Sequence, residues 1–325
     1  MAVARVSLLA IVLLALVATP VAPQAPMKLR LAVHTSTLGA ADTIAIRQGF
    51  YKQEGLDVDF RRFALGKDGR DAMISGAIDV NATATTPFLI GLDKGVPYVA
   101  IAVNSLFCAT NHVTVLKSSD INTVAQLKGK RIGLPKGTIT EHIFLSRMAP
   151  ANGLKKGDYE IANIPDAKDR MPSLVAKAID AAVLNDPFLA VAEHEGVVRS
   201  LENFCKYDVL PFIITATTKI VKEQPDAVVA YLRGWLRAVE LLRTEPEKAA
   251  AIYAEEQKSM GREIPVVVLD KALRRLRFEP ELNAQIDRYL ADEAKDAAAA
   301  GQLRAVPDLA KGTNKELLKK AMARR

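Results

Sequence analysis

Hydrophobic and polar positions along the chain follow two distinct spacings. Short apolar runs at residues 29–33, 56–60, 99–103 and 212–216 are typical of buried strands. Segments between such runs place hydrophobic residues at helical spacing, and this spacing continues from residue 225 to the end of the chain. Strands that alternate with amphipathic helices predict an α/β fold with largely parallel sheets and helices on their faces.

The same pattern occurs twice. Ala-Ile-Asp at residues 77–79 recurs at residues 178–180, and under the same shift residues 57–60 fall on residues 158–161. A Pro-Phe-Leu follows each Ala-Ile-Asp. Two copies of one α/β unit indicate paired lobes, and the cleft between such lobes is a common place for a ligand. The predicted division is lobe I, residues 27–106 plus 210–325, and lobe II, residues 107–209, with a crossing of the chain at each junction.

The N-terminal segment differs from the rest of the chain. Arg5 is followed by an apolar run at residues 8–18 and then by small residues up to Ala25. A basic start, a hydrophobic run and a small-residue segment describe a cleaved secretory signal peptide, and the run is short for a membrane span. We therefore predict a signal peptide at residues 1–25 and a periplasmic mature protein that begins near Met27. An uncleaved anchor is the alternative.

Composition and charge narrow the class of protein further. The chain has 325 residues, 50% of them hydrophobic, and a formal net charge of +7, which fits a soluble globular protein with two sizeable cores. Much of the excess positive charge follows Gly261, where a solvated helical face explains it. No basic stripe interleaved with aromatic residues is present. We expect a monomer with no nucleic-acid partner.

The sequence contains no readable catalytic constellation. No nucleophile is paired with a base, no Gly-Lys-Ser/Thr phosphate loop is present, and no histidine–carboxylate cluster has metal-binding spacing. We therefore predict no catalytic residue, no metal and no cofactor. Cys108 and Cys205 both fall in the predicted crossings; a disulfide between them and two buried free thiols are both open.

The turn at residues 135–137 is the clearest candidate for a binding element. It follows a short buried strand at residues 132–134, and Thr138 begins a helix directly after it. The free backbone N–H groups at such a helix start suit an anion or a polar head group. Thr138 and Thr140 would add hydroxyl groups, while capping of its own helix is the other role open to Thr138.

Three segments of the chain, at residues 48–58, 76–80 and 127–133, resemble the substrate-binding proteins of ABC importers in the nitrate/sulfonate/taurine family. The resemblance extends from residue 29 to about residue 255. It implies an α/β periplasmic binding protein fold of type 2, with two lobes, two hinge crossings and a helical C-terminal region. Such a protein closes on a small ligand and delivers it to a permease in the inner membrane.

The resemblance also implies which segments line the pocket: the loops after the first and third strands, the helix start after the Lys-Gly turn, and a segment that matches the family's Trp-Glu-Pro pattern. The implied ligand-binding residues are His34, Thr35, Ser36, Thr37, Thr83, Ala84, Thr85, Thr138, Ile139, Thr140, Asn185 and Asp186. Asn185 and Asp186 depart from the family's pattern, which predicts a smaller and more polar wall.

Structural roles are open for several of these residues. His34 is equally consistent with a structural histidine, and Thr83 and Thr85 with a plain helix start. Asp186 precedes a proline-started helix, so helix capping explains it fully.

Three functions follow as hypotheses. The first is a solute-binding protein that captures a small polar or anionic organic molecule by hinge closure and presents it to an ABC importer. The second is an enzyme on the same fold, of the pyrimidine-precursor or menaquinone-pathway type. The third is a regulatory sensor, although such a sensor would carry a DNA-binding helix-turn-helix that this sequence lacks. The signal peptide and the lack of a reactive cluster favour the first hypothesis.

Overall fold

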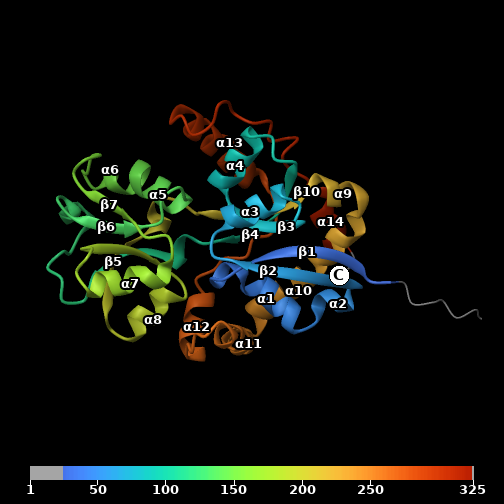
Figure 1. Ribbon diagram of the computed structural model, residues 1–325, viewed down its shortest axis with the longest axis horizontal. Helices are drawn as coiled ribbons and strands as arrows, with labels where there is room; N and C mark the ends of the chain where they lie inside the picture. The colour runs from blue at the N-terminus through green and yellow to red at the C-terminus, as the bar shows by residue number, and fades with distance from the viewer. Residues whose placement is uncertain (1–24, 324–325) are drawn as a thin grey trace, which may run out of the picture.

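The computed structural model describes residues 25–323, so nearly all of the predicted signal peptide lies outside the described residues. Two lobes lie side by side, and each is built on one five-stranded mixed sheet with helices on its faces (Figure 1). This arrangement confirms the predicted α/β class. Within residues 25–323, no helix is both long enough and apolar enough to cross a membrane.

The first lobe contains a sheet with the strand order β2-β1-β3-β10-β4. Strands β2 and β3 run parallel to β1, whereas β10 runs antiparallel to both of its neighbours. The strands are β1 (Met27–His34), β2 (Leu56–Phe63), β3 (Val80–Ala84), β4 (Tyr98–Leu106) and β10 (Pro211–Thr217).

The second lobe repeats this plan with the order β7-β6-β8-β5-β9, and here β5 is the antiparallel strand. Each sheet therefore takes its antiparallel strand from beyond a crossing of the chain. The strands are β5 (Asn111–Leu116), β6 (Arg131–Leu134), β7 (Glu160–Asn163), β8 (Ala181–Asn185) and β9 (Val198–Asn203).

The repeated Ala-Ile-Asp holds the first strand of each unit to the third. The Asp79 carboxylate accepts a hydrogen bond from the Arg30 backbone N–H at 2.9 Å, and Asp180 accepts one from the Arg131 N–H at 2.8 Å. The Arg30 guanidinium also donates to Asp79, whereas the Arg131 guanidinium donates to the Ala178 carbonyl. Both aspartates thus have a structural role.

The helices cover the sheets and continue beyond β10 into a helical C-terminal region. In the first lobe they are α1 (Ala40–Arg47), α2 (Phe50–Gln53), α3 (Gly66–Ile74) and α4 (Thr85–Asp93). In the second lobe they are α5 (Ile139–Ile143), α6 (Ala149–Ala151), α7 (Ala167–Val175) and α8 (Phe188–His194). After β10 follow α9 (Thr218–Glu223), α10 (Pro225–Thr244), α11 (Pro246–Ser259), α12 (Val266–Leu273), α13 (Ala284–Ala299) and α14 (Glu316–Met322).

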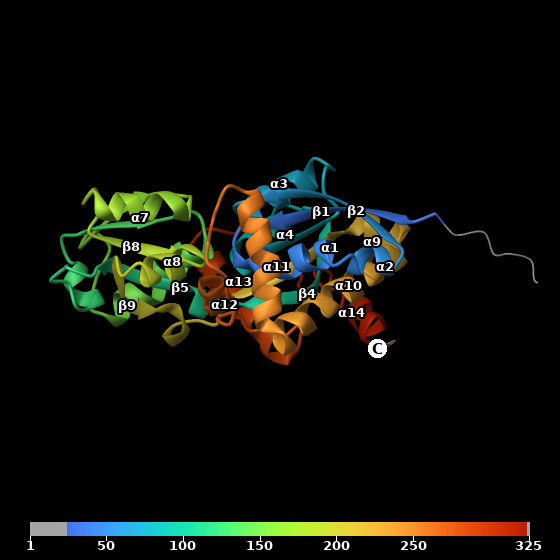
Figure 2. The ribbon, with the colours of Figure 1, turned by 90° about the horizontal axis from the view of Figure 1, so that it is seen from below.

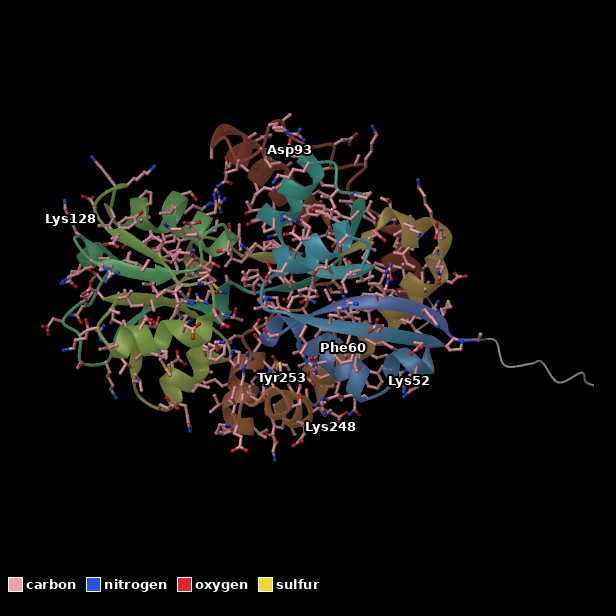
Figure 3. The ribbon with its side chains drawn as sticks, in the orientation of Figure 1. Lys52, Phe60, Asp93, Lys128, Lys248 and Tyr253 are labelled. Carbon is pink, nitrogen blue, oxygen red and sulfur yellow. A yellow bond between two sulfur atoms is a disulfide. The ribbon has the colours of Figure 1, made fainter. Side chains whose placement is uncertain are left out.

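Helix α10 lies at the centre of the larger core, and Trp235 and Tyr231 on it are fully buried. The Asp42 carboxylate is buried beside it and accepts hydrogen bonds from the hydroxyls of Tyr51 and Tyr231 at 2.7 and 3.0 Å. Burial raises the pKa of Asp42 to about 6, although both hydroxyls favour its charged form. Lys248, on the neighbouring helix α11, is exposed and points outward from the molecule (Figure 3).

Two crossings join the lobes, and a disulfide joins the crossings. Cys108 lies between β4 and β5, Cys205 lies between β9 and β10, and the two sulfurs are bonded to each other. The sequence had left this bond and two free thiols open.

A third link between the lobes comes from the C-terminal region. Helix α11 packs on α1 of the first lobe, while α12 packs on α8 of the second lobe through Val268, Ala272 and Ala190. In Figure 2, α11 and α12 lie against the region where the lobes meet. Residues 210–325, which the sequence assigned to lobe I, therefore include a helix that contacts lobe II.

Candidate functional site

A cavity of about 120 Å³ lies between the lobes, with lining residues from both of them and from the α11–α12 connection. Eleven of the twelve residues implied by the resemblance line it: His34, Thr35, Ser36, Thr37, Thr83, Ala84, Thr138, Ile139, Thr140, Asn185 and Asp186. Thr85 is the exception, since it is fully buried at the start of α4 and does not line the cavity.

The loop after β1 is held in shape by its own side chains. His34 Nδ1 accepts a hydrogen bond from the Ser36 backbone N–H at 3.1 Å and lies 2.9 Å from Ser36 Oγ. Burial lowers the pKa of His34 to about 4, so its ring is neutral near pH 7. A Cβ on Gly39 would lie 2.0 Å from the His34 carbonyl oxygen, so only glycine permits this tight return of the chain.

Two threonine hydroxyls at the cavity have no hydrogen-bond partner in the described chain. Thr37 Oγ1 and Thr83 Oγ1 are both buried, and each residue is only 1% exposed. A buried hydroxyl without a partner is unfavourable by about 1–3 kcal/mol. Both groups line the cavity, so a polar ligand atom there would relieve this cost.

The turn at residues 135–137 offers fewer free amides than the sequence suggested. The Lys136 N–H donates to Asn163 Oδ1 at 3.0 Å, and the Gly137 N–H donates to the Glu141 carboxylate at 2.6 Å. Thr138 caps its own helix, because its Oγ1 accepts from the Glu141 N–H at 3.4 Å and donates to the Pro135 carbonyl. The predicted amide cradle for an anion is thus partly occupied by the protein itself.

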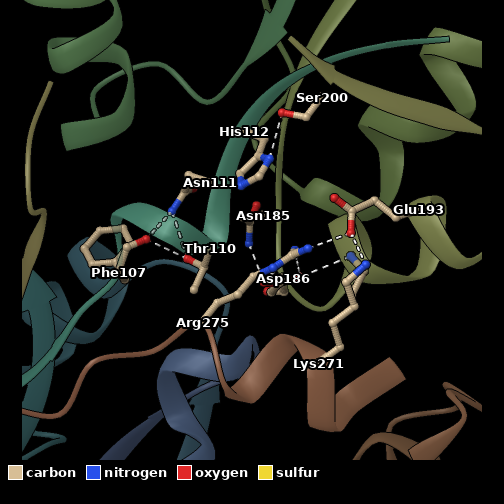
Figure 4. A network of polar contacts seen from close by, with 11 residues as sticks. Phe107, Thr110, Asn111, His112, Asn185, Asp186, Glu193, Ser200, Lys271 and Arg275 are labelled. Atoms are coloured by element: carbon tan, nitrogen blue, oxygen red, sulfur yellow. Dashed lines mark hydrogen bonds and ion pairs between the residues drawn. The ribbon is translucent and has the colours of Figure 1, made fainter. Parts of the chain in front are cut away.

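Asp186 lines the cavity, but its carboxylate is already hydrogen-bonded to other residues of the protein. Its Oδ1 accepts from the Ala190 N–H at 3.1 Å, which caps α8, and Arg275 Nη1 lies 3.2 Å from both carboxylate oxygens. Arg275 also donates to Glu193, which Lys271 contacts at 2.9 Å (Figure 4). Burial raises the pKa of Asp186 to about 7 despite the nearby Arg275. The helix-capping role that the sequence left open is therefore present.

Arg170 is the most informative lining residue that sequence reasoning missed. It lies on α7, is 3% exposed, and donates to the Val183 carbonyl at 2.6 Å and to Asn185 Oδ1 at 3.0 Å. Its Nε has no partner in the described chain. Burial lowers the pKa of Arg170 to about 10, which leaves it cationic near pH 7. An arginine on the buried face of an amphipathic helix, between Ala167 and Leu174, was the signal available in the sequence.

Two further cations line the cavity from other parts of the chain. Lys67 belongs to α3, and Arg262 lies between α11 and α12. Arg262 Nη1 donates to the Thr35 carbonyl at 3.2 Å, and its guanidinium carbon lies 5.3 Å from the centre of the Phe188 ring. Arg262 therefore contacts one residue from each lobe.

The charges around the cavity do not balance. Among the residues described, Lys67, Arg170 and Arg262 form no ion pair with a carboxylate. The two lining carboxylates already have partners, since Asp166 lies 3.4 Å from Lys168 and Asp186 pairs with Arg275. The cavity therefore has an excess of positive charge. No group of three or more potential metal ligands lies together in residues 25–323.

Comparisons with known proteins identify the family to which the chain is related. Residues 39–249 match the family model described as NMT1/THI5 like. A formylaminopyrimidine-binding protein from Halalkalibacterium halodurans is 28% identical over 221 residues, which cover 66% of this chain and 65% of that protein. The chain thus matches slightly less than two thirds of this relative's length.

Solved structures share the fold at lower identity. The periplasmic aliphatic sulphonate binding protein SsuA from Escherichia coli superposes with a TM-score of 0.76 at 20% identity, covering 88% of this chain and 92% of that one. The desulfurization enzyme DSZB superposes with a TM-score of 0.69 at 14% identity, covering 92% of this chain and 99% of that one. These likenesses confirm the predicted two-lobed fold of periplasmic binding proteins. Because the family model matches well over half of the chain, and because the fold agrees, the protein belongs to the NMT1/THI5-like family, in line with the resemblance found in its sequence.

Proposed function

We propose that this protein is an extracytoplasmic solute-binding protein that captures a small organic anion between its lobes and delivers it to an ABC permease. The cavity supports this proposal because its lining comes from both lobes, so hinge closure would surround a ligand completely. The neutral His34 and the free hydroxyls of Thr37 and Thr83 would contribute polar contacts.

The observation that carries the proposal is the buried, unpaired Arg170. A charge removed from water is strongly unfavourable unless a partner compensates for it, and Arg170 has two neutral acceptors and a free Nε. A carboxylate or sulfonate in the cavity would supply the missing negative charge and accept charge-assisted hydrogen bonds. The excess positive charge of Lys67 and Arg262 favours the same class of ligand.

The proposals of export and of transport rest on the N-terminal segment, the disulfide and the similar proteins, and not on the cavity. The predicted signal peptide at residues 1–25 would carry the chain to the periplasm. A disulfide between Cys108 and Cys205 fits an oxidising compartment. The similar proteins named above include two binding proteins, which favours a role in solute uptake with an inner-membrane permease as partner. We propose a monomer that binds no nucleic acid.

We propose that the protein is not an enzyme, although DSZB shows that the same fold is used by one. The only two cysteines of the chain are bonded to each other, so neither is a free nucleophile. Among the lining residues His34 is neutral, and Asp186 is held by Arg275 and the start of α8. One lining pair, Ser36 Oγ and His34 Nδ1, lies at 2.9 Å, but no carboxylate of the described chain orients the imidazole, and burial lowers the pKa of His34 to about 4, which makes it a weak base.

A thermal-shift screen of residues 27–325 tests the proposal. Small carboxylates and sulfonates should stabilise the fold by about 2.7 kcal/mol at one hundred times their Kd, whereas neutral and cationic analogues should not. Arg170→Met should abolish the shift. Arg199→Met is the matched control, because Arg199 also donates to backbone carbonyls but lies outside the cavity. The compound should be recovered unchanged. Consumption of the compound would indicate an enzyme, and an undiminished shift in Arg170→Met would place the anion elsewhere.

A further inference from the structure

Aromatic rings form the hinge side of the cavity. Phe107 precedes Cys108 in the first crossing, and Phe212 is the second residue of β10, which follows the second crossing. Both line the cavity. Their ring centres are 5.7 Å apart with planes at 81°, and the His34 ring meets Phe212 in the same way at 5.7 Å and 85°. Three rings in edge-to-face contact thus present a fixed aromatic surface.

A fourth ring lies on the wall that the second lobe contributes. Phe188 begins α8, lines the cavity, and carries the guanidinium of Arg262 over its face. Three of the ten phenylalanines in the chain therefore line this one cavity. Aromatic pairs gain attraction beyond the apolar area that they bury, because the edge of one ring meets the face of another. A ligand with a ring would gain this attraction, whereas a saturated chain would not.

The cations lie close to the second-lobe part of this aromatic lining. Arg170 is bound to Asn185, three residues before Phe188, and Arg262 lies over Phe188 itself. One ligand can therefore meet both kinds of surface if an anionic group and a ring are joined directly. The ligand therefore needs no long flexible spacer between its anionic group and its ring.

The volume of the cavity limits the size of the ring. It is about 120 Å³, and an apolar cavity of about 150 Å³ holds a molecule of benzene. The two volumes are of the same order, so the cavity matches a single six-membered ring, with the charged group placed at the cations that line it. Two fused rings exceed it.

We propose that the ligand is a single-ring aromatic anion, in which a carboxylate or sulfonate binds Arg170 and Arg262 and the ring packs on Phe107, Phe188 and Phe212. This inference rests on the proposed function, since it names the class of solute for the same cavity. Carboxylate and sulfonate share the chemistry that the cations recognise, and the experiment includes both.

Titration calorimetry with matched probes tests the proposal on residues 27–325. The probes are benzoate, cyclohexanecarboxylate, 2-naphthoate, benzenesulfonate, hexanesulfonate and benzyl alcohol. Benzoate or benzenesulfonate should bind about tenfold more tightly than the saturated probe with the same charged group. Naphthoate should bind more weakly than benzoate because of its size. Benzyl alcohol should bind at least about a hundredfold more weakly, because it leaves Arg170 without a negative partner.

A pair of variants isolates the contribution of the ring on the second lobe. Phe188→Leu keeps an apolar side chain and removes the ring, so the preference for benzoate over cyclohexanecarboxylate should fall to about twofold. Phe50→Leu is the control, because Phe50 also carries an arginine, Arg237, over its ring at 4.4 Å but does not line the cavity. This variant should keep the full preference.

The outcomes separate the inference from the function on which it rests. If saturated anions bind as tightly as their aromatic partners, or if Phe188→Leu leaves the preference unchanged, the aromatic class is wrong while anion binding stands. Tighter binding of naphthoate would overturn the single-ring limit. If no anion of the panel binds, both the inference and the proposed function fail.

Discussion

Replacing both cysteines by serine should lower the free energy of unfolding by about 4.7 kcal/mol. Cys108 and Cys205 are 97 positions apart, and all five strands of the second sheet lie between them. The bond therefore closes a loop that contains the whole sheet of lobe II. In the chain-entropy model, a loop of this length removes about 15.7 cal/mol/K from the unfolded chain, which gives this value at 298 K.

The expected change in melting temperature follows from the size of the protein. Unfolding entropy is about 2.1 cal/mol/K per residue near 60 °C, or about 0.63 kcal/mol/K for the roughly 300 residues described. Dividing the loss of free energy by this entropy predicts that the melting temperature falls by about 7 °C. Lobe II should lose protection from hydrogen exchange first, because its ends are no longer tied together.

Differential scanning calorimetry of the wild type, the reduced wild type and the Cys108→Ser, Cys205→Ser double variant measures this effect. Reduced wild type and double variant should melt together, and reductant should not affect the double variant. A thiol count on the unfolded wild type without reductant should find no free cysteine. If the double variant melts within about 1 °C of the oxidised wild type, the chain-entropy argument is refuted for this bond.

Two further predictions concern buried carboxylates. The folded-state pKa of Asp42 is about 6, above the usual 3.8, so the unfolding free energy falls as pH rises from 3.8 to 6 and is constant above that. Relative to wild type, the free energy of unfolding of Asp42→Asn should therefore be about 3 kcal/mol higher at pH 8 than at pH 3.5, as measured by urea unfolding. An equal difference from wild type at both pH values would contradict this reasoning. Asp79→Ala should cost about 2–3 kcal/mol and Asp180→Ala about half as much, because only Asp79 also accepts from the guanidinium of its arginine. Urea unfolding of the two variants compares them, and equal losses would show that the guanidinium bond of Arg30 contributes nothing.

The fold was predictable because local sequence patterns, which occur once in each lobe, specify its strands and helices. The recurring Ala-Ile-Asp marks a bond between neighbouring strands, and Asp79 and Asp180 perform it in the same way in both lobes. The apolar runs predict strands and the helical spacings predict helices without any information on contacts between distant residues. The antiparallel direction of β5 and β10 was less accessible, since nothing local states the direction in which a strand joins its sheet.

The segments at the cavity were predictable, but their electrostatics were not. Loops at the ends of strands converge by topology, so eleven implied residues meet at one cavity. Whether an amide or a carboxylate is free depends on partners elsewhere in the chain. Arg275 comes to Asp186 from a C-terminal segment, and Asn163 fills the amide of Lys136. Such pairings depend on tertiary packing and leave no periodic signal.

The location of positive charge in the cavity illustrates this limit. The sequence placed the anion site at a helix start, where backbone amides provide partial charges. In the structure the Glu141 carboxylate already accepts from the Gly137 N–H. Arg170 is buried beside Asn185 and forms no ion pair in the described chain, although the charge of Asp166 favours its cationic form. A full charge in a desolvated site attracts an anion more strongly than partial charges of which some are already satisfied. By this reasoning the group proposed to bind the anion lies on the buried face of α7, two helices further along the chain than α5, where the sequence indicated the site.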